Sequence, residues 1–455
     1  MDCFGALRVP RNDVRDKLWI ASVPCAVPEL VEGLNDVGIK KPRIFSDKNN
    51  MSNKKNNKIT AKAAKTKSVK LSILIVVVLM VVAFGITSIV SVVNKRKADK
   101  TVRVAFYGLS TEYCELLKKK IPQEEGINLV CDVLSDGPID LSSIKDKYDM
   151  LFTWKGELTD ALEASSAEIP AKILETMPSS LRNNKCAPIF LDHYELAYNK
   201  SVVEKTTENL PTSFPAFLNY LSQAKNYVFS PFFCAGADDR TLIAFVGAII
   251  ESIGGVNSYN ALIKELRNGT DFDELLDKNL ELTNLTLRSI LDPLRTWPKE
   301  GYTHPGWFNG IFNDLIYFAS DNQIGVFFAT LQDHRKIQYD IISRFDSFLL
   351  PPSSSTVKFG IIAPAVCGML ISDNANAKRY LAEFFTEEAQ TEFTEETKLA
   401  PVHSRVQAYD RQSDDVRYFA ASCAGGALPD LYLAAFQRNP TGFAEFAGKI
   451  RTYIR

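Results

Sequence analysis

The sequence lacks several motifs that would mark it as an enzyme. It contains no GxxxxGK[ST] phosphate loop and no GxSxG nucleophile elbow, and its four histidines form no HExxH or similar cluster. Six cysteines follow the first hundred residues without a CxxC pair or ligand-like spacing, at positions 114, 131, 186, 234, 367 and 423. We therefore expect no catalytic residue, no metal site and no cofactor, and we interpret the cysteines as small buried hydrophobic residues.

Acidic residues outnumber basic residues in the main body of the chain. The formal net charge is −1, but residues 1–70 carry +8 and residues 94–455 carry −9. A nucleic-acid-binding domain needs a basic stripe of its own, so we expect no DNA or RNA partner. With 46% hydrophobic and 24% charged residues in a chain of 455, the composition is that of a folded protein of two or three domains.

Charged residues are absent from Leu71 to Val93, a stretch long enough to cross a membrane as a helix. Seven lysines and no acidic residue lie in residues 51–70, so the positive-inside rule places the N-terminus in the cytosol. We therefore expect a single-pass anchor at 71–93 in the lipid bilayer of a bacterial cytoplasmic membrane. The basic segment at 51–70 would be cytosolic, and the C-terminal domain would face the periplasm or the outside.

Two parts of this interpretation leave alternatives open. The anchor could instead be a cleaved signal peptide, although the apolar region of a signal peptide is normally shorter. Residues 1–50 precede Met51, where the membrane-targeting pattern begins, and we interpret them as the product of an over-called start codon. A short cytosolic extension is the alternative.

From Thr101 onwards, short β-branched runs alternate with amphipathic stretches. The runs VRVAFYG, INLVCDVL and YDMLFTW are predicted to be strands, and EYCELLKKKI a helix. This alternation predicts βαβ units and an α/β fold with a parallel sheet. PIFLDHYELAYNK is predicted to be one long strand. TLIAFVGAIIESIGG is predicted to be a buried core helix, because Arg240 and Glu251 bound only ten residues, too few to cross a membrane.

Several segments, in the same order over about 350 residues, resemble the extracellular solute-binding proteins of ABC importers, in particular those that bind sugars and oligosaccharides. LAYNKSVVEKTTENLPTSFPAFLNYLSQAK is similar to that family's YNKDLFEKAG…P.TWDEF segment. NQIGVFFATLQD and FDSFLLPP resemble its GKAAM…GPW and LP strands. GMLISDNANAKRYLAEFFTEEAQTEF, followed by LAPVHSRV, resembles its ISKNSKNKEAAWEFLKFLTSPEAQ and LPA stretch. The chain departs from the family at Ala329 to Gln332, where a Gly/Trp pair would follow the AMxxxG strand.

The resemblance covers residues 101–455 and implies a two-lobed α/β fold of the periplasmic-binding-protein type, type II-like. The ligand would lie in the cleft between the lobes, which close by a hinge motion. Matching segments place three interlobe crossings near 193–198, 360–366 and 399–404. Lobe 1 would comprise residues 101–195 and 363–400, and lobe 2 residues 198–360 and 403–455.

Ligands in open α/β sheets bind beyond the carboxyl ends of the strands, and this rule selects most of our candidate ligand-binding residues. Trp154 beside Glu157 suits a sugar, because a C–H face of the sugar stacks on an indole while its hydroxyls bond to a carboxylate. By the resemblance, Asp192 matches an acidic hydroxyl-binding residue six positions before the Tyr of YN. The full set is Tyr107, Ser110, Trp154, Glu157, Asp192, Phe233, Asp239, Trp307 and Gln332.

Several candidates also have a purely structural interpretation. Ser110 could cap the following helix, Trp154 could pack in the core, and Asp192 could form a hinge salt bridge. Phe-rich loops are often buried plugs, which would apply to Phe233 and to the loop of Trp307. Alternation along a strand predicts that His193 points away from Asp192.

The resemblance implies a membrane-tethered, extracytoplasmic substrate-binding protein rather than an enzyme. Such a protein captures a small polar solute, here expected to be a sugar or oligosaccharide, and delivers it to an ABC permease driven by a separate ATPase. One alternative is a ligand-sensing module for a membrane receptor. The other is an anchored hydrolase that uses Asp192, His193 or Glu157 as acid and base.

Overall fold

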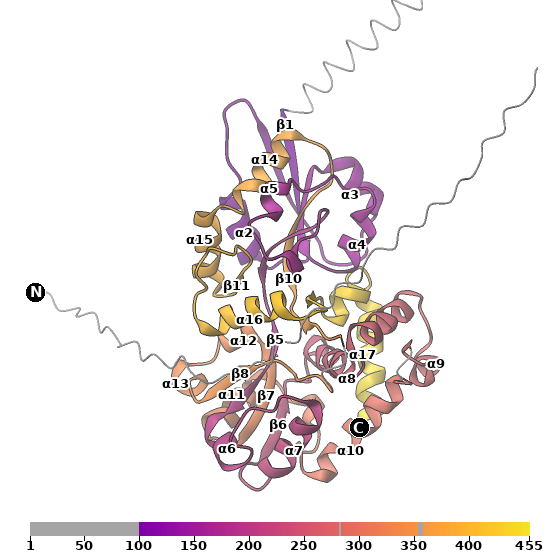
Figure 1. The fold of residues 1–455 in the computed structure, drawn as a ribbon. Coiled ribbons are helices and arrows are strands. Elements are labelled where there is room, and N and C mark those ends of the chain that lie inside the picture. The colour runs from indigo at the N-terminus through magenta and orange to yellow at the C-terminus, as the bar shows by residue number, and fades with distance from the viewer. Residues whose placement is uncertain (1–99, 282–283, 354–357) are drawn as a thin grey trace, which may run out of the picture. The chain divides into compact units, whose positions relative to one another are not determined.

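The computed structural model describes residues 100–281, 284–353 and 358–455 (Figure 1). The predicted anchor at 71–93, the basic segment before it and residues 1–50 lie outside these ranges. The described part of the chain is a mixed α/β fold with two main sheets and one small two-stranded sheet.

The larger sheet has six strands in the order β11-β4-β10-β3-β1-β2. β1 pairs in parallel with β2 and β3, which confirms the predicted βαβ units, whereas β10 is antiparallel to β3 and β4. The strands are β1 (Thr101–Tyr107), β2 (Asn128–Leu134), β3 (Met150–Trp154), β4 (Ala187–Leu191), β10 (Ala365–Leu370) and β11 (Ala400–Pro401).

The smaller sheet has four strands in the order β6-β7-β5-β8. β6 and β7 are parallel, and β5 is antiparallel to β7 and β8. The strands are β5 (Tyr194–Asn199), β6 (Ser230–Cys234), β7 (Ile324–Thr330) and β8 (Phe345–Phe348). The two-stranded sheet pairs β9 (Ile361–Ile362) with β12 (Ala427–Leu428) in parallel.

The segment predicted to be one long strand is in fact two strands of different sheets. The break falls at Asp192 and His193, between β4 and β5. The Asp192 N–H bonds to the carbonyl of Pro364, just before β10, whereas the His193 carbonyl accepts from Leu331, just after β7. All the residues of both strands are buried, so no change in the hydrophobic pattern marks the point where the chain changes sheets.

Each main sheet has its own hydrophobic core. The core of the larger sheet includes residues of its flanking helices, which are α2 (Thr111–Lys119), α3 (Leu141–Lys147), α4 (Glu157–Glu163), α5 (Ala171–Leu174), η1 (Ser179–Leu181), α14 (Ala375–Glu383), α15 (Glu387–Thr397) and α16 (Arg411–Ser422). The smaller sheet is covered by α6 (Lys200–Lys205), α7 (Phe214–Ala224), α8 (Asp239–Arg267), α9 (Phe272–Asp277), α10 (Leu287–Glu300), η3 (Trp307–Asn309), α11 (Phe312–Ser320), α12 (Leu331–His334), α13 (Tyr339–Ile342), η4 (Tyr432–Phe436) and α17 (Pro440–Ile454).

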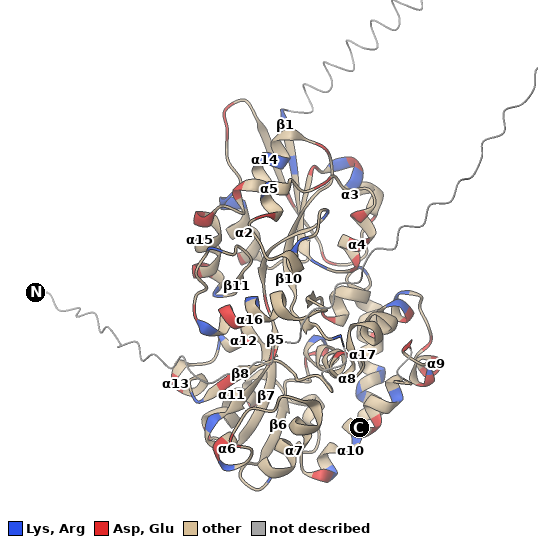
Figure 2. Ribbon diagram, in the orientation of Figure 1, with Lys and Arg blue, Asp and Glu red and all other residues tan. Residues whose placement is uncertain are grey.

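The chain passes between the two cores more than once. It leaves the larger sheet after β4, builds the smaller sheet, and returns to the larger one with β10. After β11, helix α16 adds to the core of the larger sheet and α17 to that of the smaller sheet. Figure 2 shows basic and acidic residues interspersed over the helices around both sheets.

Helix α8 is the most apolar long helix among the described residues. By length and composition it could cross a membrane, but 89% of its apolar window is buried inside the protein. It is a core helix, as predicted, and it extends to Arg267, past a break at Gly255, where φ is 71°. Its apolar side chains pack against α10, η4 and α17.

Candidate functional site

Tyr107 and Trp154 end two neighbouring strands of the larger sheet, β1 and β3. The Tyr107 hydroxyl donates to the carbonyl of Gly137 at 2.6 Å and lies 3.0 Å from the carbonyl of Gln437. Burial raises the pKa of Tyr107 to about 12. Gln437 follows η4, so a residue from the core of the smaller sheet reaches the strand ends of the larger sheet at this point.

A guanidinium lies between two aromatic rings beside these strand ends. The Arg240 guanidinium carbon is 5.7 Å from the centroid of the Trp154 ring and 5.4 Å from that of Tyr432. Arg240 comes from the first turn of α8, and its Nε and Nη2 donate to Asp430 Oδ2 at 2.9 and 2.8 Å. A cation over an aromatic ring contributes about 0.5 to 2 kcal/mol. Trp154 is 8% exposed, so this packing covers most of its indole.

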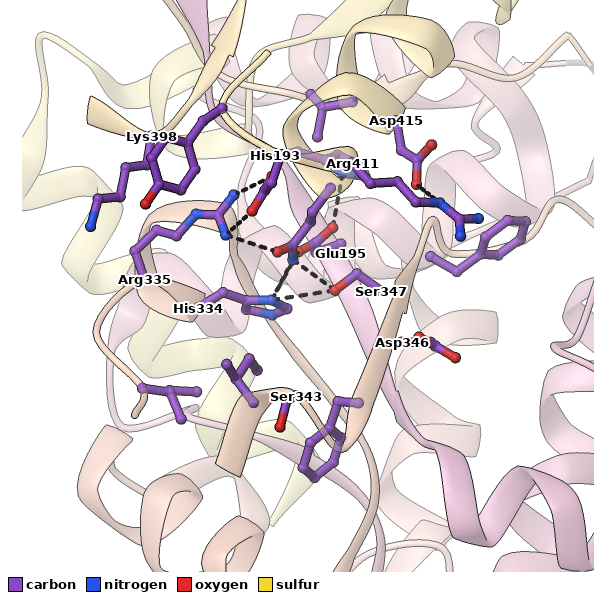
Figure 3. A pocket seen from close by; sticks show the side chains of 18 of the residues that line it. His193, Glu195, His334, Arg335, Ser343, Asp346, Ser347, Lys398, Arg411 and Asp415 are labelled. Carbon is purple, nitrogen blue, oxygen red and sulfur yellow. Dashed lines mark hydrogen bonds and ion pairs between the residues drawn. The ribbon is translucent and has the colours of Figure 1, made fainter. Parts of the chain in front are cut away.

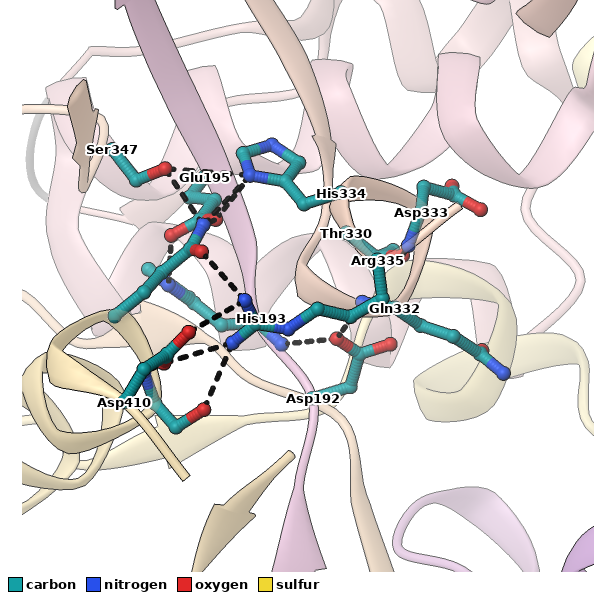
Figure 4. Close-up of polar contacts among 12 residues, drawn as sticks. Asp192, His193, Glu195, Thr330, Gln332, Asp333, His334, Arg335, Ser347 and Asp410 are labelled. Carbon is teal, nitrogen blue, oxygen red and sulfur yellow. Dashed lines mark hydrogen bonds and ion pairs between the residues drawn. The ribbon is translucent and has the colours of Figure 1, made fainter. Parts of the chain in front are cut away.

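Asp192 lies in the connection between the sheets, close to this group. Its Oδ1 accepts from the backbone N–H of His193 at 2.8 Å and of Gln332 at 3.2 Å (Figure 4). Burial raises the pKa of Asp192 to about 6, although both hydrogen bonds and the charge of Arg240 lower it. Tyr113 connects Trp154 with Asp192. Its ring centroid is 6.0 Å from that of Trp154, and its pKa is raised by burial and by the charge of the nearby Asp192.

We refer to Trp154, Asp192, Arg240, Asp430 and Tyr432 as the Asp192 cluster. Next to it, the backbone of Gly156 touches that of Leu433, and a Cβ at Gly156 would lie 2.2 Å from the Leu433 carbonyl oxygen. Backbone from the two cores therefore meets without an intervening side chain.

The remaining candidates have other contacts. Ser110 is the N-cap of α2 and accepts from the N–H of Tyr113 at 3.3 Å, and Gln332 is half-buried in α12. Glu157 pairs with Arg438 at 2.7 Å, and Asp239 with Arg451 at 2.7 Å.

Phe233 and Trp307 have no exposed surface. The Trp307 ring packs edge-to-face on Phe232 and Phe245, and Phe233 lies in the core beneath α11. In this conformation both aromatic side chains make core contacts, and the Asp192 cluster does not include them.

Sequence reasoning missed three residues of this region: Arg240, Asp430 and Tyr432. The strand-end rule reaches Arg240 through β6, but that arginine was interpreted only as the charged boundary of an apolar helix. Asp430 and Tyr432 follow no predicted strand, so the strand-end rule does not select them. No local pattern there indicates a partner 190 residues away.

A cavity of about 910 Å³ lies on the other side of the connecting segment (Figure 3). His193 and Glu195 line it from the start of β5, together with residues of β8, α12, α13 and α16. The Nδ1 of His193 is 3.7 Å from Glu195 Oε2, which confirms that His193 points toward Glu195 and away from Asp192.

Glu195 is held inside a polar network. His334 Nδ1 lies 3.0 Å from Glu195 Oε1, and Gln412 of α16 donates to the same carboxylate (Figure 4). Gln412 also donates to Ser347 Oγ at 2.7 Å. Burial raises the pKa of Glu195, but the charges of His334 and His193 and the contact with His334 outweigh burial and lower it to about 2.

A second link joins the same two walls. Arg335, next to α12, donates to both carboxylate oxygens of Asp410 at 2.7 and 2.9 Å, and to Ser413 Oγ at 3.0 Å. Asp410 is the N-cap of α16. We refer to the cavity with these walls as the His193 cavity. Among the described residues, no group of three or more His, Cys, Asp or Glu side chains could hold a metal ion.

The fold matches those of solved sugar-binding proteins. The bacterial solute receptor AcbH, which prefers β-D-galactopyranose, is 12% identical, with a TM-score of 0.58 over 78% of this chain and 96% of that chain. MsmE from Bacillus subtilis, in an open conformation, is 14% identical, with a TM-score of 0.60 over 78% and 93%. A sugar transporter protein from Bacillus licheniformis in complex with stachyose is 13% identical, with a TM-score of 0.52 over 78% and 98%.

At these identities the likeness shows the fold alone. It is the fold of solved bacterial solute-binding and sugar-binding proteins, and the similar structures are binding or transport proteins rather than enzymes. A scan against protein-family models and a search of curated proteins find no match.

Proposed function

We propose that this protein is the membrane-tethered, extracytoplasmic substrate-binding protein of an ABC importer and that it is not an enzyme. It captures a small polar solute, a sugar or oligosaccharide, at the Asp192 cluster and delivers it to a permease driven by a separate ATPase. The helix expected at 71–93 holds it in the cytoplasmic membrane, with residues 101–455 outside.

The observation that carries the proposal is the Asp192 cluster itself. Two aromatic rings, a guanidinium and two carboxylates, those of Asp192 and Asp430, come together from both cores at the strand ends of the larger sheet. A sugar needs this combination, because its C–H faces stack on rings while its hydroxyls donate to carboxylates and accept from N–H groups. Such ends of open α/β sheets are where ligands bind.

Because the Asp192 cluster is buried, binding of a solute there requires a movement of the protein. Trp154 is 8% and Asp192 4% exposed, so a solute reaches them only if the two cores separate. We assign residues 101–195 with 363–400 to one lobe and residues 198–360 with 403–455 to the other, except that α16 packs in the core of the larger sheet and therefore belongs with the first lobe. The connection at Asp192 and His193 is one of three crossings about which the lobes turn. The open conformation of the similar MsmE structure supports such a movement.

The binding site can be tested by thermal unfolding of the full-length chain in a detergent without a sugar headgroup. A solute that binds only the folded state stabilises it by about 2.7 kcal/mol at 100 times its Kd. We expect galactose, stachyose or another sugar of a panel to raise the Tm of the wild type but not of Arg240→Ala.

Arg288→Ala is the matched control. Arg288 also pairs with an aspartate, at 2.5 Å, and lies 5.9 Å from a tyrosine ring, but on α10 and away from the cluster. Its sugar response should equal that of the wild type. A panel without any response, in a chain that unfolds cooperatively, would overturn the sugar assignment.

The tether is tested separately by fractionation. The full-length chain should stay in the membrane fraction after an alkaline wash, and a variant without residues 71–93 should be released. An intact mass that matches a chain beginning after residue 93 would instead show a cleaved signal peptide.

A further inference from the structure

We propose that the His193 cavity is a second binding site, for a neutral hydroxyl-rich solute such as a sugar or polyol, and that its occupation favours the packed state of the Asp192 cluster. This inference rests on the proposed function only for its second part. The cavity and its lining are independent of the solute bound at the cluster.

The volume and openness to solvent fit a small organic ligand. Ligand pockets measure about 300 to 1,000 Å³, and this cavity measures about 910 Å³. Tyr339 and Tyr409 line it and are 84% and 48% exposed. Arg335 and Lys398 cover Tyr409 at 5.6 and 5.4 Å from its centroid, whereas most of Tyr339 is open to solvent. An exposed tyrosine ring at a cavity offers a stacking surface for a sugar face.

The charges of the lining point to a neutral ligand. Four basic and four acidic side chains line the cavity, and six of them form three ion pairs. Arg335 pairs with Asp410, Lys200 with Asp346 at 3.3 Å, and Arg411 with Asp415 at 3.7 Å. Glu195 lies against His334, and Lys398 lies over the Tyr409 ring. An anion or cation at any of the three pairs would have to break it. A hydroxyl both donates and accepts, so it can bond to either member without separating them.

Some buried polar atoms at the cavity still have hydrogen-bonding capacity. Among the described residues, the Nδ1 of His193 and the Nε of Arg335 are buried without a hydrogen-bond partner. A buried donor or acceptor without a partner costs about 1 to 3 kcal/mol, and hydroxyls of a ligand could offset that cost.

The position of the cavity couples it to the Asp192 cluster. One wall, α16, belongs to the core of the larger sheet, and β5, β8, α12 and α13 belong to the smaller sheet. Asp192 and His193 are adjacent in the connecting segment, and their side chains point to opposite sides of it. In this conformation the cluster is packed while the cavity is open. A solute that fits the open cavity therefore favours the packed cluster, and by linkage a solute that enters the cluster by separating its side chains disfavours binding in the cavity.

The test counts bound sugars on the full-length chain by native mass spectrometry and calorimetry, with galactose, stachyose and sorbitol as probes. We expect two bound molecules per wild-type chain and one in Tyr339→Ala. Ser343→Trp, which fills the cavity from an exposed position, should have the same effect without touching the core. Tyr317→Ala is the matched control, because Tyr317 is 62% exposed but lies on α11, outside the lining.

The coupling has its own readout. Loss of the second site should strengthen binding at the Asp192 cluster about 5-fold or more in the presence of the cavity ligand, the lower end of usual allosteric couplings. An unchanged affinity at the cluster in Tyr339→Ala and Ser343→Trp would overturn the coupling.

The outcomes separate the two proposals. One bound sugar in the wild type, lost in Arg240→Ala but kept in Tyr339→Ala, overturns the second site and leaves the proposed function intact. One bound sugar lost in Tyr339→Ala but kept in Arg240→Ala supports the cavity and overturns the Asp192 cluster as a binding site. No bound probe in any variant overturns both.

Discussion

The Asp192 cluster and the His193 cavity differ although adjacent residues of one segment face them. The cluster is packed, with a guanidinium between two rings and a fully buried partner, Asp430. The cavity is open, and its ion pairs lie at partly exposed positions. The difference shows that alternation along a connecting strand can place a desolvated site and a solvated one back to back. It also predicts that similar substitutions at the cluster and at the cavity lower the free energy of unfolding by different amounts.

The largest difference is expected for the two arginines that join the cores. Arg240→Ala leaves Asp430, which is 0% exposed, without its partner, and should cost about 3 to 5 kcal/mol in the free energy of unfolding. Arg335→Ala leaves Asp410, which is 36% exposed, and should cost about 1 kcal/mol or less. Urea unfolding of both variants measures this. Equal costs would contradict the contrast between a desolvated and a solvated side.

The next effect concerns Glu195, whose pKa is lowered from 4.5 to about 2. A carboxyl with a lowered pKa stabilises the folded state above its ordinary pKa, and this contribution is lost as the pH falls from about 4.5 towards 2. Glu195→Gln should therefore cost about 3 kcal/mol at pH 7, and the deficit should shrink at acid pH. Urea midpoints of both proteins between pH 7 and 3 measure it. A deficit independent of pH would indicate lost packing instead.

The contribution of Asp192 to stability should depend on pH with the opposite sign, because burial raises the pKa of Asp192 from 3.8 to about 6. Its protonated form stabilises the folded state below about pH 4, and this contribution is lost as the pH rises through 6. Relative to the wild type, Asp192→Asn should gain about 1 to 3 kcal/mol between pH 4 and 7. The same urea series measures it. A gain that falls with increasing pH would show that the carboxylate is stabilised by its neighbours and not penalised by burial.

The smallest effect separates a structural role from a binding role at Ser110. Ser110 is the N-cap of α2, so Ser110→Ala should lower the free energy of unfolding by about 1 kcal/mol and leave the sugar affinity unchanged. Thr386→Ala, at the N-cap of α15, is the matched control and should cost a similar amount. Calorimetric titration of both variants with the sugar found in the panel measures the affinity. A selective loss of affinity in Ser110→Ala would place Ser110 in the binding site.

The half of the larger sheet formed by β1, β2 and β3 could be predicted, since these strands and their helices follow one another in sequence and each has a clear local pattern. The parallel pairing of β1 with β2 and β3 follows from that order. The break at Asp192 and His193 could not be predicted, because residues on both sides are buried and the pattern is uniform. The cap at Ser110 was one of two interpretations, and the structure contains it.

The site was predicted only where a strand end or the family resemblance marks it. Trp154 was selected as a strand end and Asp192 through the family resemblance, and both lie beside Arg240 in the structure. Their partners Arg240, Asp430 and Tyr432 come from elements whose local sequence shows only helix formation. The polar network of the His193 cavity also joins distant parts of the sequence, because Gln412 donates to Glu195, which lies 217 residues before it. Contacts of this kind depend on how two cores meet, which no local pattern contains.

Helix α8 has a consequence for how the protein is made. Its apolar side chains are covered partly by residues of η4 and α17, such as Phe436, Phe443 and Ala447. During synthesis the chain therefore exposes a helix with the length and composition of a membrane span until residues 431–454 have emerged. Folding of the second core is delayed to the end of translation. An exported nascent chain would depend on a holding chaperone during that interval, and a truncation before α17 should aggregate or insert into the bilayer.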